Sequence, residues 1–172
     1  MGKIVLVMLL SLMTTSSSAQ KVISGSFSAL SSEKAVSVKW DFGSTVFEKK
    51  YNEREWESIN GEAEWNKAKN EAMSLILKCI NEELKKAHVY VVGENLSNEC
   101  KYTILVSPIN LDRKSNNKSN YYLVDKNNTE IACVQIKGDG GHWGSLGNLL
   151  GDGYEEAARK LGKLIKKSVR KK

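Results

Sequence analysis

The segment from Glu130 to Val169 constrains the fold more than any other part of the chain. It begins with a run of mostly apolar residues, Ile131–Ile136, that is typical of a buried strand. A glycine-rich loop, residues 138–153, leads into an amphipathic helix near the carboxyl end. Apolar residues recur along this helix at steps of three and four, which predicts one buried face. A strand and a helix of this kind bury their apolar faces against a shared core, so we expect packed layers of sheet and helix.

Residues 1–19 have the pattern of a signal peptide. Lys3 supplies the positive start, an apolar run covers residues 4–13, and Ser17 and Ala19 are the small residues that a signal peptidase requires. A membrane-spanning helix needs about 20 apolar residues, so an anchor is the weaker interpretation. We therefore expect an exported chain, periplasmic or secreted, that is cleaved after Ala19. The remainder, residues 20–172, suits a single domain with an adequate core.

Hydrophobic periodicity predicts the main elements of that domain. Residues 35–42 alternate as a half-buried strand, and residues 62–87 have helical spacing. Lys101–Ile109 is the most apolar strand, while residues 121–124 and 130–137 read as a hairpin. Together these elements predict an α+β fold. It is a two-layer sandwich, in which a mixed sheet of about four to five strands carries two main helices packed mostly on one face.

Several local features give further expectations. Residues 20–34 are interpreted as an edge segment or short strand. Residues 43–61 have mixed signals and are interpreted as an irregular connection, with a short strand or a turn of helix as the alternative. Pro108 should mark the place where strand pairing is interrupted, because proline lacks the donor that a ladder needs. The segment Asp112–Ser119 is too hydrophilic for a core and is expected to form an exposed tip. The last helix is expected to begin after Asp152, with Asp152 and Glu155 as a capping box.

Three cysteines, Cys79, Cys100 and Cys133, have no CxxC spacing. Zinc sites need clustered ligands, so no metal or cofactor is expected. Cys79 falls on the apolar face of a helix and Cys133 in an apolar strand, which favours buried thiols that act as small hydrophobes. A bridge between Cys79 and Cys100 in an oxidising compartment stays open.

The glycine-rich loop 138–153 is the first candidate site, with His142 and Trp143 as speculative binding residues. A loop that leads into a helix amino terminus can bind an anion, but this one lacks the lysine and serine of a nucleotide-binding P-loop. His142 acts as a general base only if a carboxylate or nucleophile lies within reach. The main interpretation of the loop is a flexible excursion, and no catalytic motif occurs elsewhere. We therefore predict that the chain is not an enzyme.

The basic carboxyl-terminal helix is the second candidate site. The chain has a formal net charge of +6. The candidate residues on the helix are Lys163, Lys166, Lys167 and Arg170. A cationic helix face is usually solvated, but it can also attract lipopolysaccharide, acidic glycan or lipid headgroups. Nucleic acid is not an expected partner, because aromatic residues are not interleaved with the charges.

The pattern of elements in residues 101–167 resembles the carboxyl half of small exported α/β domains of Gram-negative bacteria. These domains include uncharacterised secreted proteins and the periplasmic domain of curli-secretion lipoproteins. The resemblance rests on a central strand, a hairpin whose turn runs from Asp125 to Thr129, and a final amphipathic helix. It covers roughly 70 residues and implies an envelope protein that acts by binding. The lipid-anchor cysteine of the lipoproteins is absent here, and the resemblance assigns no functional residue.

These observations predict an exported, non-catalytic domain that binds an envelope protein or a second copy of itself. The expected contact is a sheet edge at residues 121–124, because unpaired strand groups accept a further strand. One alternative is a binder of anionic surface polymers that uses the basic helix. The other is an enzyme whose site is the glycine-rich loop. No transmembrane segment is expected in the mature chain.

Overall fold

The computed structural model describes residues 20–170, so the predicted signal peptide lies outside the described residues. The strands are β1 (Gln20–Gly25), β2 (Ala35–Trp40), β3 (Val46–Phe47), β4 (Tyr90–Val92), β5 (Tyr102–Leu111), β6 (Asn117–Asp125) and β7 (Glu130–Gly138). The helices are α1 (Glu53–Asn60), α2 (Glu62–Leu84) and α3 (Leu146–Val169), with two 3-10 helices, η1 (Phe27–Ser32) and η2 (Glu94–Glu99).

The strands form one seven-stranded sheet in the order β1-β7-β6-β5-β2-β4, and β3 pairs with a later part of β5. The strands β1, β7, β6 and β5 are antiparallel neighbours, whereas β5, β2 and β4 run parallel. The predicted α+β fold with a mixed sheet is therefore confirmed. The predicted count of four to five strands is wrong, because the sheet has seven strands, of which β3 and β4 have only two and three residues.

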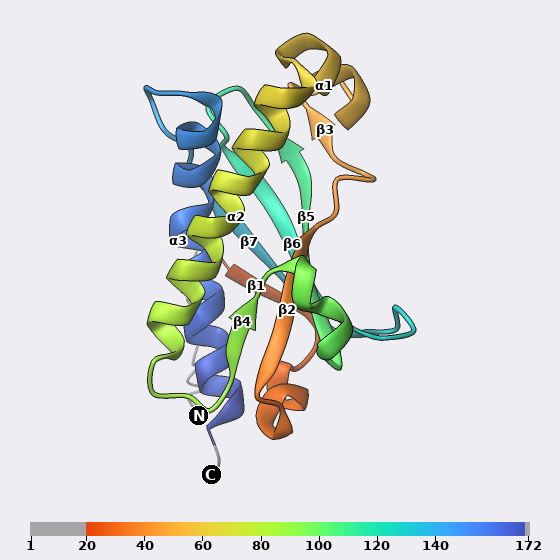
Figure 1. Ribbon diagram of the computed structural model, residues 1–172, viewed down its shortest axis with the longest axis vertical. Coiled ribbons are helices and arrows are strands. Elements are labelled where there is room, and N and C mark those ends of the chain that lie inside the picture. The colour runs from red at the N-terminus through yellow and green to blue at the C-terminus, as the bar shows by residue number, and fades with distance from the viewer. Residues whose placement is uncertain (1–19, 171–172) are drawn as a thin grey trace, which may run out of the picture.

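The two long helices, α2 and α3, lie side by side along one face of the sheet (Figure 1). The sheet positions beneath them are apolar and buried: Val36, Val38, Ile104, Val106, Tyr121, Leu123, Val134 and Ile136. Because successive strand residues point to opposite faces, the intervening positions face away from the helices. The opposite face of the sheet thus carries the residues between these apolar positions.

The connection predicted to be irregular contains the helix α1. Asn52 and Glu55 form its capping box, in which the Asn52 side chain accepts from the Glu55 backbone N–H at 3.0 Å. The Glu55 carboxylate in turn accepts from the Asn52 N–H at 2.9 Å. Such reciprocal bonds satisfy two otherwise free donors at the start of a helix. An asparagine followed three residues later by glutamate is the signal that would have predicted α1.

The last helix starts earlier than expected, at Leu146, so the prediction that Asp152 and Glu155 form its cap is wrong. Ser145 is the cap, and its hydroxyl accepts from the Asn148 N–H at 3.2 Å. The first turns of α3 contain Gly147 and Gly151, which are poor helix formers in isolation. A Cβ on Gly147 would displace the flexible Glu71 carboxylate and would lie 3.5 Å from the Ala68 Cα, both on α2. Close packing against α2 therefore overrides the low helix propensity of glycine.

The hydrophilic segment 112–119 is not entirely an exposed tip, because Asn117 and Ser119 are buried in β6. The Asn117 side-chain amide donates to the Gly153 carbonyl at 3.0 Å, and the Ser119 hydroxyl lies 3.0 Å from the Tyr154 hydroxyl. These bonds tie β6 to α3. Burial raises the pKa of the Tyr154 phenol well above its usual range, so the hydroxyl stays protonated at neutral pH.

The hairpin between β6 and β7 agrees with the sequence. The Asp125 carboxylate accepts backbone bonds from Asn127 and Thr129 at 2.8 and 2.9 Å, and Asn128 has the positive φ expected at such a turn. The bond from Thr129 is the main reason why the pKa of Asp125 lies below its usual value. The predicted interruption at Pro108 is also confirmed, since the register of β5 and β6 shifts between Pro108 and Asn110.

Candidate functional site

The glycine-rich loop is shorter than predicted and consists of residues 139–145, at the amino-terminal end of α3. His142 and Trp143 are both solvent-exposed there, and the Trp143 side chain has an exposed fraction of 90%. His142 has no hydrogen bond or ion pair to any residue within the described range 20–170. The general-base role therefore has no carboxylate or nucleophile in place.

Glycines at the start of this segment serve close backbone contact. A Cβ on Gly140 would overlap the carbonyl oxygen of Lys114, and one on Gly138 would overlap that of Gly153. The Gly140 N–H donates to the Asn116 side-chain oxygen at 2.9 Å. The loop is thus attached to the segment that precedes β6, and the expectation of a flexible excursion has to be corrected for Gly138 and Gly140.

The predicted residues Lys163, Lys166, Lys167 and Arg170 lie at the other end of α3 from the loop. Lys163, Lys167 and Arg170 are exposed and Lys166 is half-buried. Seventeen residues separate Leu146 from Lys163, about 25 Å of helix, so the structure does not unite these lysines with His142 and Trp143. Lys166 and Lys167 occupy the last turn, where cations stabilise the helix dipole.

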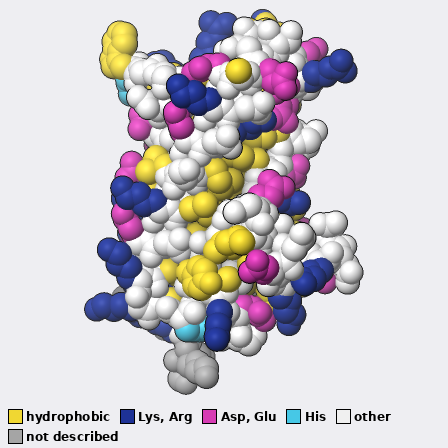
Figure 2. Space-filling model, in the orientation of Figure 1, with side chains coloured by type: hydrophobic (Ala, Val, Ile, Leu, Met, Phe, Trp, Pro, Cys, Tyr) yellow, Lys and Arg dark blue, Asp and Glu magenta, His cyan; other side chains and the backbone are white. Residues whose placement is uncertain are grey.

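Figure 2 shows the molecule in the orientation of Figure 1, with a band of hydrophobic side chains running obliquely across it. Lysine, arginine and acidic side chains are interspersed on both sides of this band. Surface charges of a single sign produce an electrostatic potential that attracts charged polymers, whereas the potentials of interspersed positive and negative charges cancel within a short distance. This view of the molecule therefore contains no extended cationic field.

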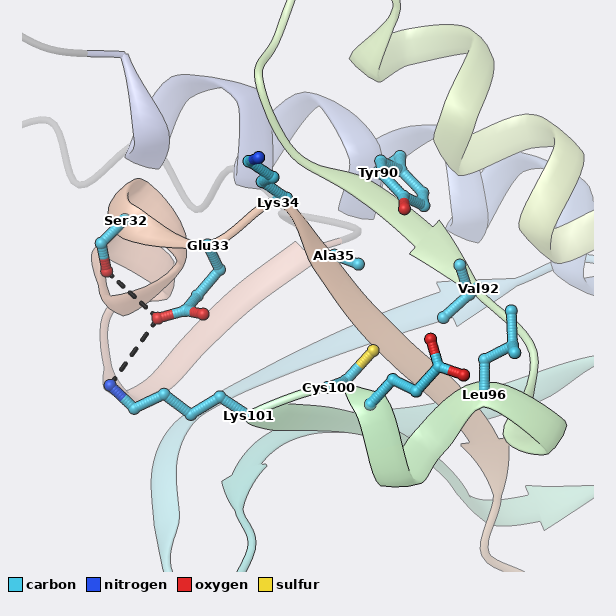
Figure 3. Close-up of a pocket in the computed structure, with 10 residues that line it drawn as sticks. Ser32, Glu33, Lys34, Ala35, Tyr90, Val92, Leu96, Cys100 and Lys101 are labelled. Carbon is cyan, nitrogen blue, oxygen red and sulfur yellow. Dashed lines mark hydrogen bonds and ion pairs between the residues drawn. The ribbon is translucent and has the colours of Figure 1, made fainter.

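A hollow of about 370 Å³ lies between η1, β2, β4 and η2, and Figure 3 shows its lining. The Glu33 carboxylate accepts from the Ser32 hydroxyl at 3.1 Å and forms an ion pair with Lys101 at 3.6 Å. Cys100 also lines the hollow, on the side nearer Leu96, and burial raises the pKa of its thiol. A protonated thiol is a weak nucleophile, so the hollow lacks an activated group.

All three cysteines are buried and free, which confirms the predicted burial of Cys79 and Cys133; the burial of Cys100 was not predicted. The possible bridge between Cys79 and Cys100 is not present. Burial raises the pKa of the Cys133 thiol to about 11, which keeps it protonated at neutral pH. Residues 20–170 contain no group of three or more histidine, cysteine or acidic side chains that could hold a metal ion.

The two edges of the sheet differ in a way that the sequence did not reveal. Residues 121–124 are not an edge, because β6 lies in the middle of the sheet and pairs with both β5 and β7. The edges are β4 and β1. At β4, the side-chain amide of Asn81 donates to the Val91 carbonyl and accepts from the Val91 N–H, both at 2.9 Å. Asn81 thus takes the place of a further strand and closes this edge.

Replacement of Asn81 by alanine should lower the free energy of unfolding by about 1–2 kcal/mol, because Val91 loses both partners. Urea unfolding measures the change. Asn81→Asp should lose at least as much, since aspartate still accepts from the Val91 N–H but its second carboxylate oxygen would face the Val91 carbonyl oxygen without a proton between them. Asn70, an exposed asparagine of the same helix, gives the control Asn70→Ala, which should leave stability unchanged or slightly increased. Equal losses at positions 70 and 81 would contradict the role of Asn81.

The outer edge of β1 has no neighbouring strand within the described chain. Val22 and Ile23 on β1 have exposed fractions of 57% and 49%. A small hollow of about 70 Å³ beside them is lined by residues that include Val22, Phe27 and Leu164. From Lys21 to Gly25 this edge thus combines an outer side that pairs with no other described strand with exposed apolar side chains, a pattern that invites a further strand.

Comparisons with known proteins give little further information. No family model matches the chain, and no curated protein matches it. The solved structures that match this chain include a variant of the PelC dodecamer from Paraburkholderia phytofirmans and a PelC dodecamer from the same organism. The first is 12% identical with a TM-score of 0.42 and covers 88% of this chain and 98% of that chain. The second is 12% identical with a TM-score of 0.38 and covers 87% and 94%. Similarity at this level establishes neither a family nor a function.

No helix within residues 20–170 has the length and apolar character needed to cross a membrane.

Proposed function

We propose that the chain is an exported, non-catalytic domain that acts by binding another protein chain through the edge of β1. The observation that carries the proposal is the contrast between the two edges. Asn81 closes the edge at β4, while the outer side of residues 21–25 in β1 has no neighbouring strand among the described residues and carries the exposed Val22 and Ile23. Natural proteins usually protect an unused sheet edge against pairing with further strands, so an edge without such protection indicates a binding partner.

A strand added at β1 gains main-chain hydrogen bonds along the edge, while side chains supply specificity. The hollow lined by Val22, Phe27 and Leu164 offers room for part of an apolar side chain of the added strand. Export rests on the signal-peptide pattern of residues 1–19, with a periplasmic or secreted location. The partner is either an envelope protein or a second copy of this chain.

The non-catalytic character rests on what surrounds the reactive groups in the described chain. His142 has no hydrogen-bonded partner, the thiols are held protonated by burial, and Glu33 and Lys101 pair with one another. General acid–base and nucleophilic catalysis both need a reactive group held beside a second one. An enzymatic role for the glycine-rich loop therefore has less support than binding.

A photo-reactive amino acid placed at Ile23 of the full chain tests the proposal. In the cell envelope we expect a covalent product that contains a second protein, and the size of the product separates self-association from another partner. Ile59 on α1 is a matched control, because its exposed fraction is 54%, close to that of Ile23. A second variant carries the photo-reactive amino acid at Val22 instead and also gives the product. Adding Ile23→Lys to this variant should abolish the product, because lysine on an edge opposes strand addition. The same yield from positions 23 and 59, or no product from position 23, would refute the proposal.

A further inference from the structure

The face of the sheet that α2 and α3 leave uncovered carries several lysines. Along β6, residues 117, 119, 121 and 123 are buried toward the helices, so Lys118, Asn120 and Tyr122 face the opposite side. Cross-strand partners share a face, which places Lys137 and Gln135 of β7 beside Lys118 and Asn120. By the same register, Lys39 of β2 and Lys21 of β1 also lie on the uncovered face.

Two of these lysines are direct neighbours. Lys118 pairs with Lys137 in the antiparallel ladder of β6 and β7. Like charges placed directly opposite one another are destabilising. Lys118 and Lys137 line a hollow of about 420 Å³, and Lys49, which follows β3, lines it as well. None of the three lysines forms an ion pair with any residue in the described part of the chain, so their charge is available for a ligand.

Two acids also line this hollow, Asp112 and Asp139. The Asp112 carboxylate already accepts bonds from the Lys114 and Asn116 backbone N–H groups and from the Asn116 amide, each at 2.9 Å. These donors offset much of its negative charge locally. Asp139 is exposed at the rim, and its single negative charge compares with three positive charges on Lys49, Lys118 and Lys137. The hollow therefore keeps an excess of positive charge.

Polar side chains continue from the hollow across the uncovered face. The Gln135 amide donates to the Asn120 side-chain oxygen at 3.0 Å, and the Asn120 amide donates to the Tyr122 hydroxyl at 2.8 Å. Neighbouring strands lie about 4.8 Å apart, so hydrogen-bonding groups recur at short, regular steps. Amides and a tyrosine ring beside clustered lysines suit a chain that carries both hydroxyl groups and carboxylates.

We propose that this surface binds an acidic polysaccharide, with a carboxylate of the sugar chain held by Lys49, Lys118 and Lys137. Single-stranded nucleic acid needs several aromatic platforms for successive bases, and the strands beside the hollow offer the one ring of Tyr122 on this face. The basic end of α3 is not part of the surface. The proposal does not depend on strand addition at β1, since its ligand and its residues are different.

The test measures binding of the full chain to polygalacturonate, a polymer of uronic acid, with neutral dextran as the reference. We expect binding to polygalacturonate alone, and weaker binding as ionic strength rises. The double variant Lys118→Gln with Lys137→Gln should bind about tenfold more weakly, since each lysine contributes a hydrogen bond between charged groups. The matched control is Lys163→Gln with Lys167→Gln, which removes the same charge from α3 and should keep the affinity.

A thermal melt adds a second measurement that is independent of the polymer. Relief of the like-charge pair should raise the melting temperature of the double variant by about 1–2 °C at low salt, which also establishes that it folds.

Equal loss of binding in both double variants would overturn the proposal in favour of general charge, and loss in the α3 variant alone would place binding on that helix. Tighter binding of single-stranded DNA, or inorganic phosphate competing at equal concentration of anionic groups, would also overturn it.

Discussion

Replacement of Trp65 by alanine should lower the free energy of unfolding by about 3–5 kcal/mol, the range measured when a large aromatic side chain is removed from a core. Trp65 is fully buried at the start of α2. Its ring contacts Phe42 and Phe47, with ring centroids 5.3 and 5.6 Å away. Because strands, α1 and α2 converge on this cluster, the cavity cannot collapse without moving several elements.

The indole of Trp65 also has a polar role, because its Nε1 donates to the Glu53 carboxylate at 3.0 Å and so ties α2 to α1. Trp65→Phe keeps most of the apolar volume but loses this bond, and a smaller loss of about 1–2 kcal/mol is expected. Chemical denaturation followed by circular dichroism measures both changes.

Trp143 provides the control for Trp65, since it is the same residue type with a side chain that is 90% exposed. Trp143→Ala should change stability by less than about 0.5 kcal/mol, as is usual for exposed positions. It should also remove the part of the tryptophan fluorescence that acrylamide quenches in the native state. A large stability loss in Trp143→Ala, or a small one in Trp65→Ala, would contradict the assigned burial.

Replacement of Gly138 by alanine should cost about 2–4 kcal/mol, which is large for the addition of a single methyl group. The new Cβ would overlap the Gly153 carbonyl oxygen and crowd the Asn117 side-chain amide. Relief of this overlap pushes apart the two groups that hydrogen-bond at 3.0 Å across β6 and α3. The cost therefore combines overpacking with the loss of a buried hydrogen bond.

Gly43 is the matched control for Gly138, because it is exposed and a Cβ there meets only the flexible Asp41 side chain, at 3.3 Å. Gly43→Ala should leave stability unchanged or raise it by up to about 1 kcal/mol, since alanine restricts the unfolded chain. Urea unfolding of the two variants measures the change in the free energy of unfolding. Similar stabilities for Gly138→Ala and Gly43→Ala would show that the close approach of β7 to α3 is not tight.

Sequence periodicity was sufficient where an element is long and has one buried face. The spacing of Trp65, Ala68, Ala72 and Ile76 predicted α2, and the apolar run in residues 101–109 predicted β5. The hairpin of β6 and β7 was predicted from the turn residues that follow Asp125, and the hydrogen bonds that hold this turn are local as well. In each case the stabilising pattern lies within a short stretch of sequence.

Other features were missed because their partners are distant in the sequence. The glycines of α3 read as a loop, since a helix of Gly147 and Gly151 is favourable only when α2 lies against it. Asn117 and Ser119 read as an exposed tip, since their burial depends on Tyr154 and Gly153. The residues of the candidate surfaces were missed for the same reason, because no local pattern distinguishes Ile23 or Lys118 from other exposed positions.

The amino-acid sequence alone predicted the fold class, the two long helices, the central strands and the burial of Cys79 and Cys133. These features follow from local hydrophobic spacing, which every residue of an element shares. Three features became known only from the arrangement of the folded chain: β4 rather than β6 lies at the edge opposite β1, Asn81 closes that edge, and Lys118 lies opposite Lys137. Strand order and register arise from pairing between residues far apart in the chain, so neither can be read from a local pattern of residues.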